Sequence, residues 1–99
     1  MKKKKFNLEI KKQDNNVFVF LNDNVLFENA NEFYEEIKKH YNNNYNLIID
    51  FTKCQKADTS LLACLSVIQN YFKSIIIKCL NDEIKYILTL WQIPKLVIS

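Results

Sequence analysis

The chain has 99 residues, enough for one domain spanning residues 1–99 and too few for a second. Its net charge of +3 is carried by lysine alone, and four of the 14 lysines stand at residues 2–5. The absence of arginine argues against a specific nucleic-acid reader, and the absence of glycine excludes a P-loop or a dinucleotide-binding fingerprint.

The N-terminus combines Met1 with a run of lysines but lacks the apolar stretch of a signal peptide. We interpret residues 1–5 as a frayed basic tail that could at most touch anionic lipid weakly. No run of 18 apolar residues is present, so no membrane span is expected.

The three cysteines, Cys54, Cys64 and Cys79, are an odd number without metal-ligand spacing. We expect reduced cytoplasmic thiols, with Cys64 and Cys79 packed as small core residues. The single histidine, His40, falls at the polar end of a predicted helix and is expected to be solvated. No metal or other cofactor is therefore predicted.

The N-terminal half predicts a hairpin followed by a helix. Phe6, Leu8 and Ile10 alternate with polar residues, which is typical of a half-buried edge strand. A polar turn at residues 13–16 joins it to an apolar strand at residues 17–21. The amphipathic helix that follows ends at the asparagines 42–44, and its apolar face is Ala30, Phe33, Tyr34, Ile37 and Tyr41.

The C-terminal half alternates strands with helices. Residues 47–51 form a continuous apolar strand, which we expect to be covered on both faces. A short strand at residues 75–77 and a last one at 96–98 are also predicted. The helix between the predicted strands at residues 47–51 and 75–77 buries Leu61, Leu62, Leu65, Ile68 and Phe72. A third helix begins at Asn81, is ended by Pro94 and buries Ile84, Ile87, Leu88 and Trp91.

The predicted order of elements is β-β-α-β-α-β-α-β. Alternation of strands and helices implies parallel strand pairs with right-handed crossovers, and the first hairpin adds an antiparallel edge. We therefore predict a mixed α/β fold, with a mixed sheet and helices mainly on one of its faces.

Catalytic groups are hard to find in this chain. No His–carboxylate–nucleophile set is recognisable around the single histidine. Asp50 and Asp58 are eight residues apart around a loop and could converge as paired carboxylates. A strand end and a helix start give both residues simpler structural roles, so we predict no enzymatic activity.

Asp58, Thr59 and Ser60 stand where a polar loop meets a helix, and two interpretations are open. In the first, Asp58 or Thr59 caps the helix by accepting a hydrogen bond from a free backbone N–H, which contributes about 1 kcal/mol. In the second, Ser60 or Thr59 is a site of phosphorylation or partner contact. The helix dipole would favour a phosphate there, but the charge of Asp58 would oppose it.

The chain resembles the strand–loop–helix signature of STAS domains, the sulphate-transporter and anti-sigma-factor-antagonist modules. The predicted element order also agrees with that fold over nearly the whole chain. The resemblance implies a protein-binding domain whose partner contacts fall at the helix start. It is carried by Leu47-Ile48-Ile49-Asp50-Phe51 and by Ala57-Asp58-Thr59-Ser60-Leu61-Leu62, and the implied contacts are Asp58, Thr59, Ser60, Leu61 and Leu62.

Two further segments, Asn81-Asp82 and Ile93-Pro94, resemble the small STAS subunit of the lipid-asymmetry (Mla) ABC transporter. This resemblance implies a non-catalytic cytoplasmic subunit that docks on the ATPase of a phospholipid transporter, stabilises or regulates it, and meets the membrane only through that complex. Its functional hydroxyl would be Thr59. The alternative is an anti-sigma-factor antagonist that a serine kinase binds and phosphorylates at Ser60.

Leu61 stands where the family pattern has a glycine. We expect a leucine here to obstruct the approach of a kinase and to act as an exposed apolar anchor, which favours docking over a phosphorylation switch. Accordingly, Thr59→Glu and Leu61→Asp are both expected to weaken partner binding without unfolding the domain.

Overall fold

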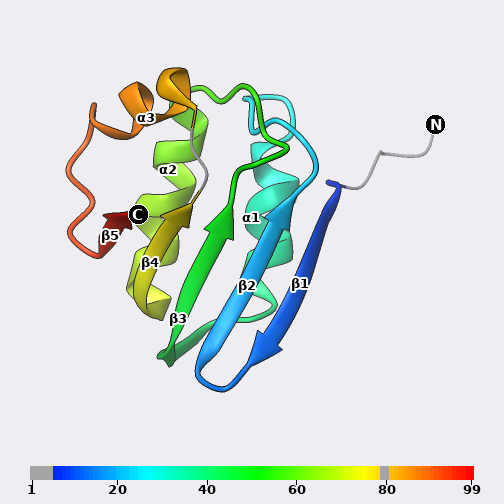
Figure 1. The fold of residues 1–99 in the computed structure, drawn as a ribbon, viewed down its shortest axis with the longest axis vertical. Helices are drawn as coiled ribbons and strands as arrows, with labels where there is room; N and C mark the ends of the chain where they lie inside the picture. The colour runs from blue at the N-terminus through cyan, green and yellow to red at the C-terminus, as the bar shows by residue number, and fades with distance from the viewer. Residues whose placement is uncertain (1–5, 79–80) are drawn as a thin grey trace.

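The computed structural model describes residues 6–78 and 81–99. The tail at residues 1–5 and Cys79, both assigned a role above, lie outside this part of the chain. The described residues form a five-stranded sheet with the strand order β1-β2-β3-β4-β5, together with three α-helices. Figure 1 shows these elements and their connections.

The strands and helices alternate as predicted. The strands are β1 (Leu8–Gln13), β2 (Asn16–Leu21), β3 (Asn42–Asp50), β4 (Phe72–Lys78) and β5 (Leu96–Ile98). The helices are α1 (Ala30–Lys38), α2 (Thr59–Ile68) and α3 (Asp82–Leu88), and a 3-10 turn, η1 (Gln69–Tyr71), joins α2 to β4. β1 and β2 pair antiparallel, whereas all other neighbouring strands are parallel. This arrangement confirms the mixed α/β class and the edge position of β1.

Helices α1 and α2 lie on one face of the sheet, and Figure 1 shows both behind the strands. In β2, buried Val17, Val19 and Leu21 alternate with half-buried residues that face the other way. Leu47, Ile48 and Ile49 of β3 are all buried, in agreement with the prediction that this strand is covered on both faces, although α1 and α2 lie on one face alone. Ile48 is buried because it lies between Phe18 and Ile76, its register partners in the neighbouring strands.

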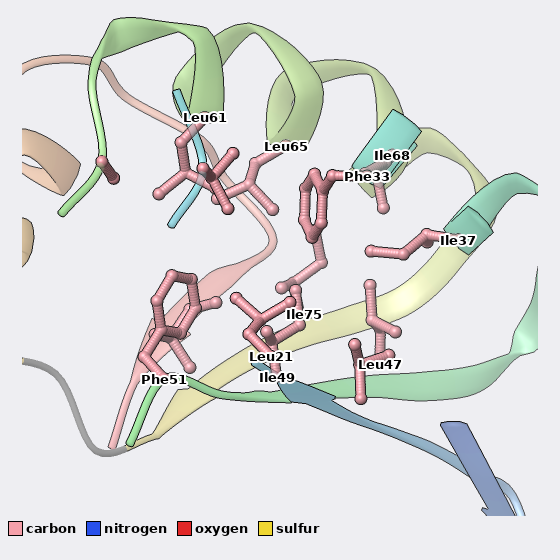
Figure 2. Packing of buried hydrophobic residues seen from close by; sticks show 14 of the residues in the cluster. Leu21, Phe33, Ile37, Leu47, Ile49, Phe51, Leu61, Leu65, Ile68 and Ile75 are labelled. Atoms are coloured by element: carbon pink, nitrogen blue, oxygen red, sulfur yellow. The ribbon is translucent and has the colours of Figure 1, made fainter. Parts of the chain in front are cut away.

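The core fills the space between this face and the two helices. Figure 2 shows side chains of both helices pointing toward those of the strands. Each is fully or almost fully buried, and together they form one continuous cluster. The cluster includes Phe33 and Ile37 of α1, Leu61, Leu65 and Ile68 of α2, and Leu21, Leu47, Ile49 and Ile75 of the sheet.

Residues 42–44 do not end the first helix but begin β3, so α1 is shorter than predicted. Asn42 pairs with Phe72 of β4, and this tertiary pairing overrides the low strand propensity of asparagine. Tyr41 lies beyond the helix, and its ring stacks on that of Tyr71 with 4.2 Å between ring centres.

The helices α2 and α3 also end earlier than their apolar patterns suggest. The 3-10 turn η1 ends α2 before Phe72, so Phe72 is a buried residue of β4 rather than of the helix. The last turn of α3 is closed by a hydrogen bond from the Thr89 N–H to the Tyr86 carbonyl. Trp91 therefore lies outside the helix and is exposed, and Pro94 follows rather than terminates α3.

We expect Leu65→Ala to lower the free energy of unfolding by about 2–5 kcal/mol, since it removes a fully buried side chain from the centre of α2 and leaves a cavity. A urea titration monitored by circular dichroism measures this change in the free energy of unfolding. Val67→Ala is the matched control, because Val67 is exposed on the same helix. An equal decrease in the free energy of unfolding for the two variants would contradict the burial of Leu65 and the exposure of Val67 on α2.

Candidate functional site

The candidate site lies where the parallel strands β2, β3 and β4 end and their connections to the helices begin. The Asn24 side-chain carbonyl accepts hydrogen bonds from the N–H groups of Gln55 and Lys56, both at 2.9 Å. The side-chain amide of Asn81 donates to the Gln55 carbonyl, also at 2.9 Å. The loops that carry the site are thus bound to one another.

Asp58 is the cap of α2 and also ties this helix to the β2–α1 loop. Its Oδ1 accepts from the Ser60 N–H at 2.9 Å, which confirms the capping interpretation for Asp58. Its Oδ2 accepts from the Phe27 N–H at 2.8 Å, a contact across 31 positions of the chain. Burial raises the pKa of this carboxyl, but the hydrogen bonds from Ser60 and Phe27 favour the charged form and hold the pKa below its usual value.

Thr59 and Ser60 occupy the first turn of α2 at the surface. Thr59 is exposed and Ser60 is half-buried, so both predicted hydroxyl residues lie beside the Asp58 carboxylate. Leu61 and Leu62 differ: both are 0% exposed and belong to the core cluster. The expected role of Leu61 as an exposed anchor is therefore wrong, because its side chain points from α2 toward the sheet (Figure 2). For the same reason it does not stand in the way of a kinase.

Phe27 is the site residue that sequence reasoning missed. Its side chain is 84% exposed, although its backbone N–H is held by Asp58. Aromatic side chains are enriched at the centres of protein interfaces, so an exposed phenylalanine on an ordered backbone is a candidate contact residue. The available signal was an aromatic residue that belongs neither to the preceding strand nor to the apolar face of α1.

An apolar hollow of about 370 Å³ extends from Phe27 between α1 and α2. We call it the α1–α2 groove. No charged residue lines it, and α2 contains no charged residue at all. Its lining residues are Phe27, Ala30, Asn31, Tyr34, Ser60, Ala63, Cys64 and Val67. The groove thus offers apolar contact area next to the two hydroxyl groups.

The two cysteines of the described residues, Cys54 and Cys64, form no disulfide with each other. Cys64 is half-buried in the groove, and its Sγ lies 3.5 Å from the Ala30 carbonyl oxygen. Burial, reinforced by the charge of Asp58, raises the pKa of the Cys64 thiol to about 11. Burial also raises the pKa of Cys54. Both side chains are therefore neutral thiols at physiological pH.

The other titratable residues considered in the sequence have local roles. Asp50 accepts hydrogen bonds from the N–H and Oγ1 of Thr52, at 2.8 and 2.6 Å, at the end of β3. His40 is half-buried rather than solvated, and burial, assisted by the charge of Lys12, lowers its pKa. Among residues 6–78 and 81–99, no three His, Cys, Asp or Glu side chains cluster as a metal site would require. None of the helices in this part of the chain is long and apolar enough to cross a membrane.

Asp58→Ala is expected to lower the free energy of unfolding by about 1–2 kcal/mol at pH 7, because the α2 cap and the contact to Phe27 are both lost. The pKa of Asp58 is depressed in the folded state, so its contribution is present above the unfolded-state pKa and is lost as pH falls through the folded-state value. The difference between the two proteins should accordingly shrink below about pH 4.

Urea titrations at pH 7 and pH 3 measure this difference. Asp58→Asn is the control, since it keeps one acceptor oxygen but cannot titrate in this range. A difference that stays constant between the two pH values would show that the carboxylate charge does not stabilise the junction.

Comparison with known proteins relates this chain to a known domain family. The sequence model of the STAS domain matches residues 7–97. A solved Thermotoga maritima structure, described as that of a candidate anti-sigma factor antagonist, superimposes with a TM-score of 0.67 and 17% sequence identity. The superposition covers 84% of this chain and 76% of the other. No curated protein sequence matches the chain at a significant level.

Proposed function

We propose that this chain, which belongs to the STAS domain family, is a non-catalytic cytoplasmic module that binds a protein partner through the start of α2. The observation that carries the proposal is the contact of the Asp58 carboxylate with the Phe27 N–H. This contact holds the backbone of Phe27 at the start of α2, and the exposed Phe27 side chain lines the α1–α2 groove together with Ser60.

Rigidity and apolar area both support docking at this surface. The loops around Phe27 are held by the side chains of Asn24, Asp58 and Asn81. A surface that is already ordered loses little conformational entropy when a partner binds. Both Asp58 oxygens already accept backbone N–H groups, which favours a structural over a catalytic role for this carboxylate.

The first partner we propose is the ATPase subunit of a phospholipid ABC transporter, through which the chain would meet the membrane indirectly. One of the residues that carry the resemblance to the transporter subunit has a clear structural role in this chain. Asn81 caps α3 by accepting from the Ile84 N–H at 2.8 Å. Removal of the chain from its cells should then lower the abundance of the ATPase and the rate of lipid transport. Unchanged values for both would exclude this partner.

The second candidate function is a serine-phosphorylation switch, as in an anti-sigma-factor antagonist. Two observations favour it: Ser60 lines the mouth of the groove, and Leu61 is buried and leaves the approach to Ser60 free. A phosphate on Ser60 would put charge beside Asp58 and beside an apolar contact surface. Phosphorylation would thus release a partner bound there.

Intact-mass analysis of the chain purified from its own cells separates the two functions. The switch predicts a fraction of molecules heavier by one phosphate, which Ser60→Ala removes and Ser66→Ala, also on α2, leaves in place. Constitutive docking predicts a single unmodified mass under all growth conditions. A phosphate that persists in Ser60→Ala would place the modification elsewhere, with Thr59 the next residue to substitute.

A further inference from the structure

We propose that the α1–α2 groove receives an amphipathic helix of the partner, with an apolar ridge flanked by basic side chains. This inference rests on the proposed docking function and specifies the chemistry of the partner. It follows from two features of the described residues: the distribution of charge around the groove and the shape and polarity of its walls.

Charge around the groove is opposite in sign to the charge of the chain as a whole. The segment from Phe27 to Ile37, which leads into and forms most of α1, contains four acidic residues and no lysine, although the net charge of the chain is +3. Glu28 is exposed next to Phe27, and Glu35 is exposed one helical turn beyond Asn31, which lines the groove. The ionised Asp58 adds a third negative charge, at the Phe27 end of the groove.

Lys56 is the basic residue beside the Phe27 end of the groove, where its carbonyl accepts from the Val25 N–H at 3.2 Å, and it offsets one of these negative charges. No lysine lies between Ala57 and Phe72, so α2 contributes no positive charge. On α1 the first lysine is Lys38, whose Nζ lies 5.9 Å from the centre of the Tyr34 ring. Acidic residues thus outnumber lysines along α1 and at the start of α2. Basic side chains of a partner would pair there with Glu28 and Glu35 and stack on the exposed ring.

The walls of the groove suit a helix rather than a charged or extended segment. One wall is α1 and the other is the outer face of α2. Ala63 and Val67 are exposed on this face, and α2 has no charged side chain. Two neighbouring helices form a furrow that a third helix fills with an apolar ridge. An extended strand would need unpaired backbone groups to pair with, and these two helices offer none along their length.

A photo-crosslinking amino acid at position 67, introduced into the full chain in its own cells, tests this inference. Mass spectrometry then identifies the crosslinked segment of the partner. A synthetic peptide of that sequence is titrated into the purified chain, into the double variant Glu28→Gln/Glu35→Gln, and into Glu83→Gln. Glu83 is the matched control, since it is exposed on α3.

The expected segment has apolar residues at helical spacing and more lysine and arginine than acidic residues. Its peptide should bind the double variant about three- to tenfold more weakly at low salt, in proportion to two exposed charge pairs, and Glu83→Gln should match the unmodified chain. The difference should disappear at about 0.5 M salt. An acidic or extended segment, equal binding to the double variant, or a second copy of this chain as the crosslinked species would overturn the inference.

Failure of this inference is distinguishable from failure of the docking proposal. If position 67 yields no crosslink but Phe27→Ala abolishes capture of the partner, docking stands and the groove is not the seat of a helix. If Phe27→Ala also leaves capture unchanged, both fail.

Discussion

Leu61→Asp is expected to unfold the domain. Leu61 is fully buried in the cluster between α2 and the sheet, so the substitution puts an unpaired carboxylate among apolar side chains. The combined loss of packing and burial of charge should lower the free energy of unfolding by at least about 4–5 kcal/mol. Such a loss is close to the whole stability of many small domains, which is about 5–15 kcal/mol.

Circular dichroism and thermal denaturation measure this effect. Thr59→Glu is the matched control, because Thr59 is exposed and lies two residues earlier on the same helix. An acidic side chain in the first turn of a helix is favoured by the helix dipole, so Thr59→Glu should keep the melting temperature while weakening partner binding. A folded Leu61→Asp variant with a cooperative transition near that of the unmodified chain would contradict the burial of Leu61.

Phe27→Asp is expected to reduce capture of the partner by at least about 30-fold, as loss of a central aromatic anchor does in other interfaces. Its side chain is 84% exposed, so the free energy of unfolding should change by less than about 0.5 kcal/mol. The Phe27 N–H can still donate to Asp58, since the substitution leaves the backbone intact. The measurement is quantitative pull-down of the partner from cells with a tagged chain.

Tyr86→Asp is the control for this variant. Tyr86 is 66% exposed on α3, outside the residues that line the groove, so it tests the effect of removing any exposed aromatic side chain. Equal losses of capture for both variants, or an undiminished capture by Phe27→Asp, would exclude Phe27 as the anchor.

Much of the fold could be predicted because its periodic signals are strong. The alternation of strands and helices gave the correct order of elements, and the polar residues before α2 and α3 marked both helix starts. Asp58 and Asn81 are the caps that the structure shows. The boundaries that depend on tertiary pairing were missed, since no local signal shows that residues 42–44 pair with β4.

The candidate site was predicted only in part. Asp58, Thr59 and Ser60 lie at the surface as expected, because a helix start exposes its first turn. The apolar periodicity of α2 predicts Leu61 on the buried face of the helix, whereas the glycine of the family pattern suggests an exposed position. The structure agrees with the apolar periodicity, since Leu61 is fully buried. Local sequence marked Phe27 only as an aromatic residue outside the neighbouring strand and helix face; its place at the start of α2 depends on a hydrogen bond to a residue 31 positions away.

The central claim is that a protein partner binds at Phe27 and the start of α2. Nuclear magnetic resonance of the isotope-labelled chain, titrated with the purified partner, tests it most directly. We expect the largest signal changes at Phe27, Thr59, Ser60 and Val67, with little change on the open face of the sheet, for example at Phe18. Changes concentrated on that open face, with the signals of Phe27 and Ser60 unaffected, would contradict the claim.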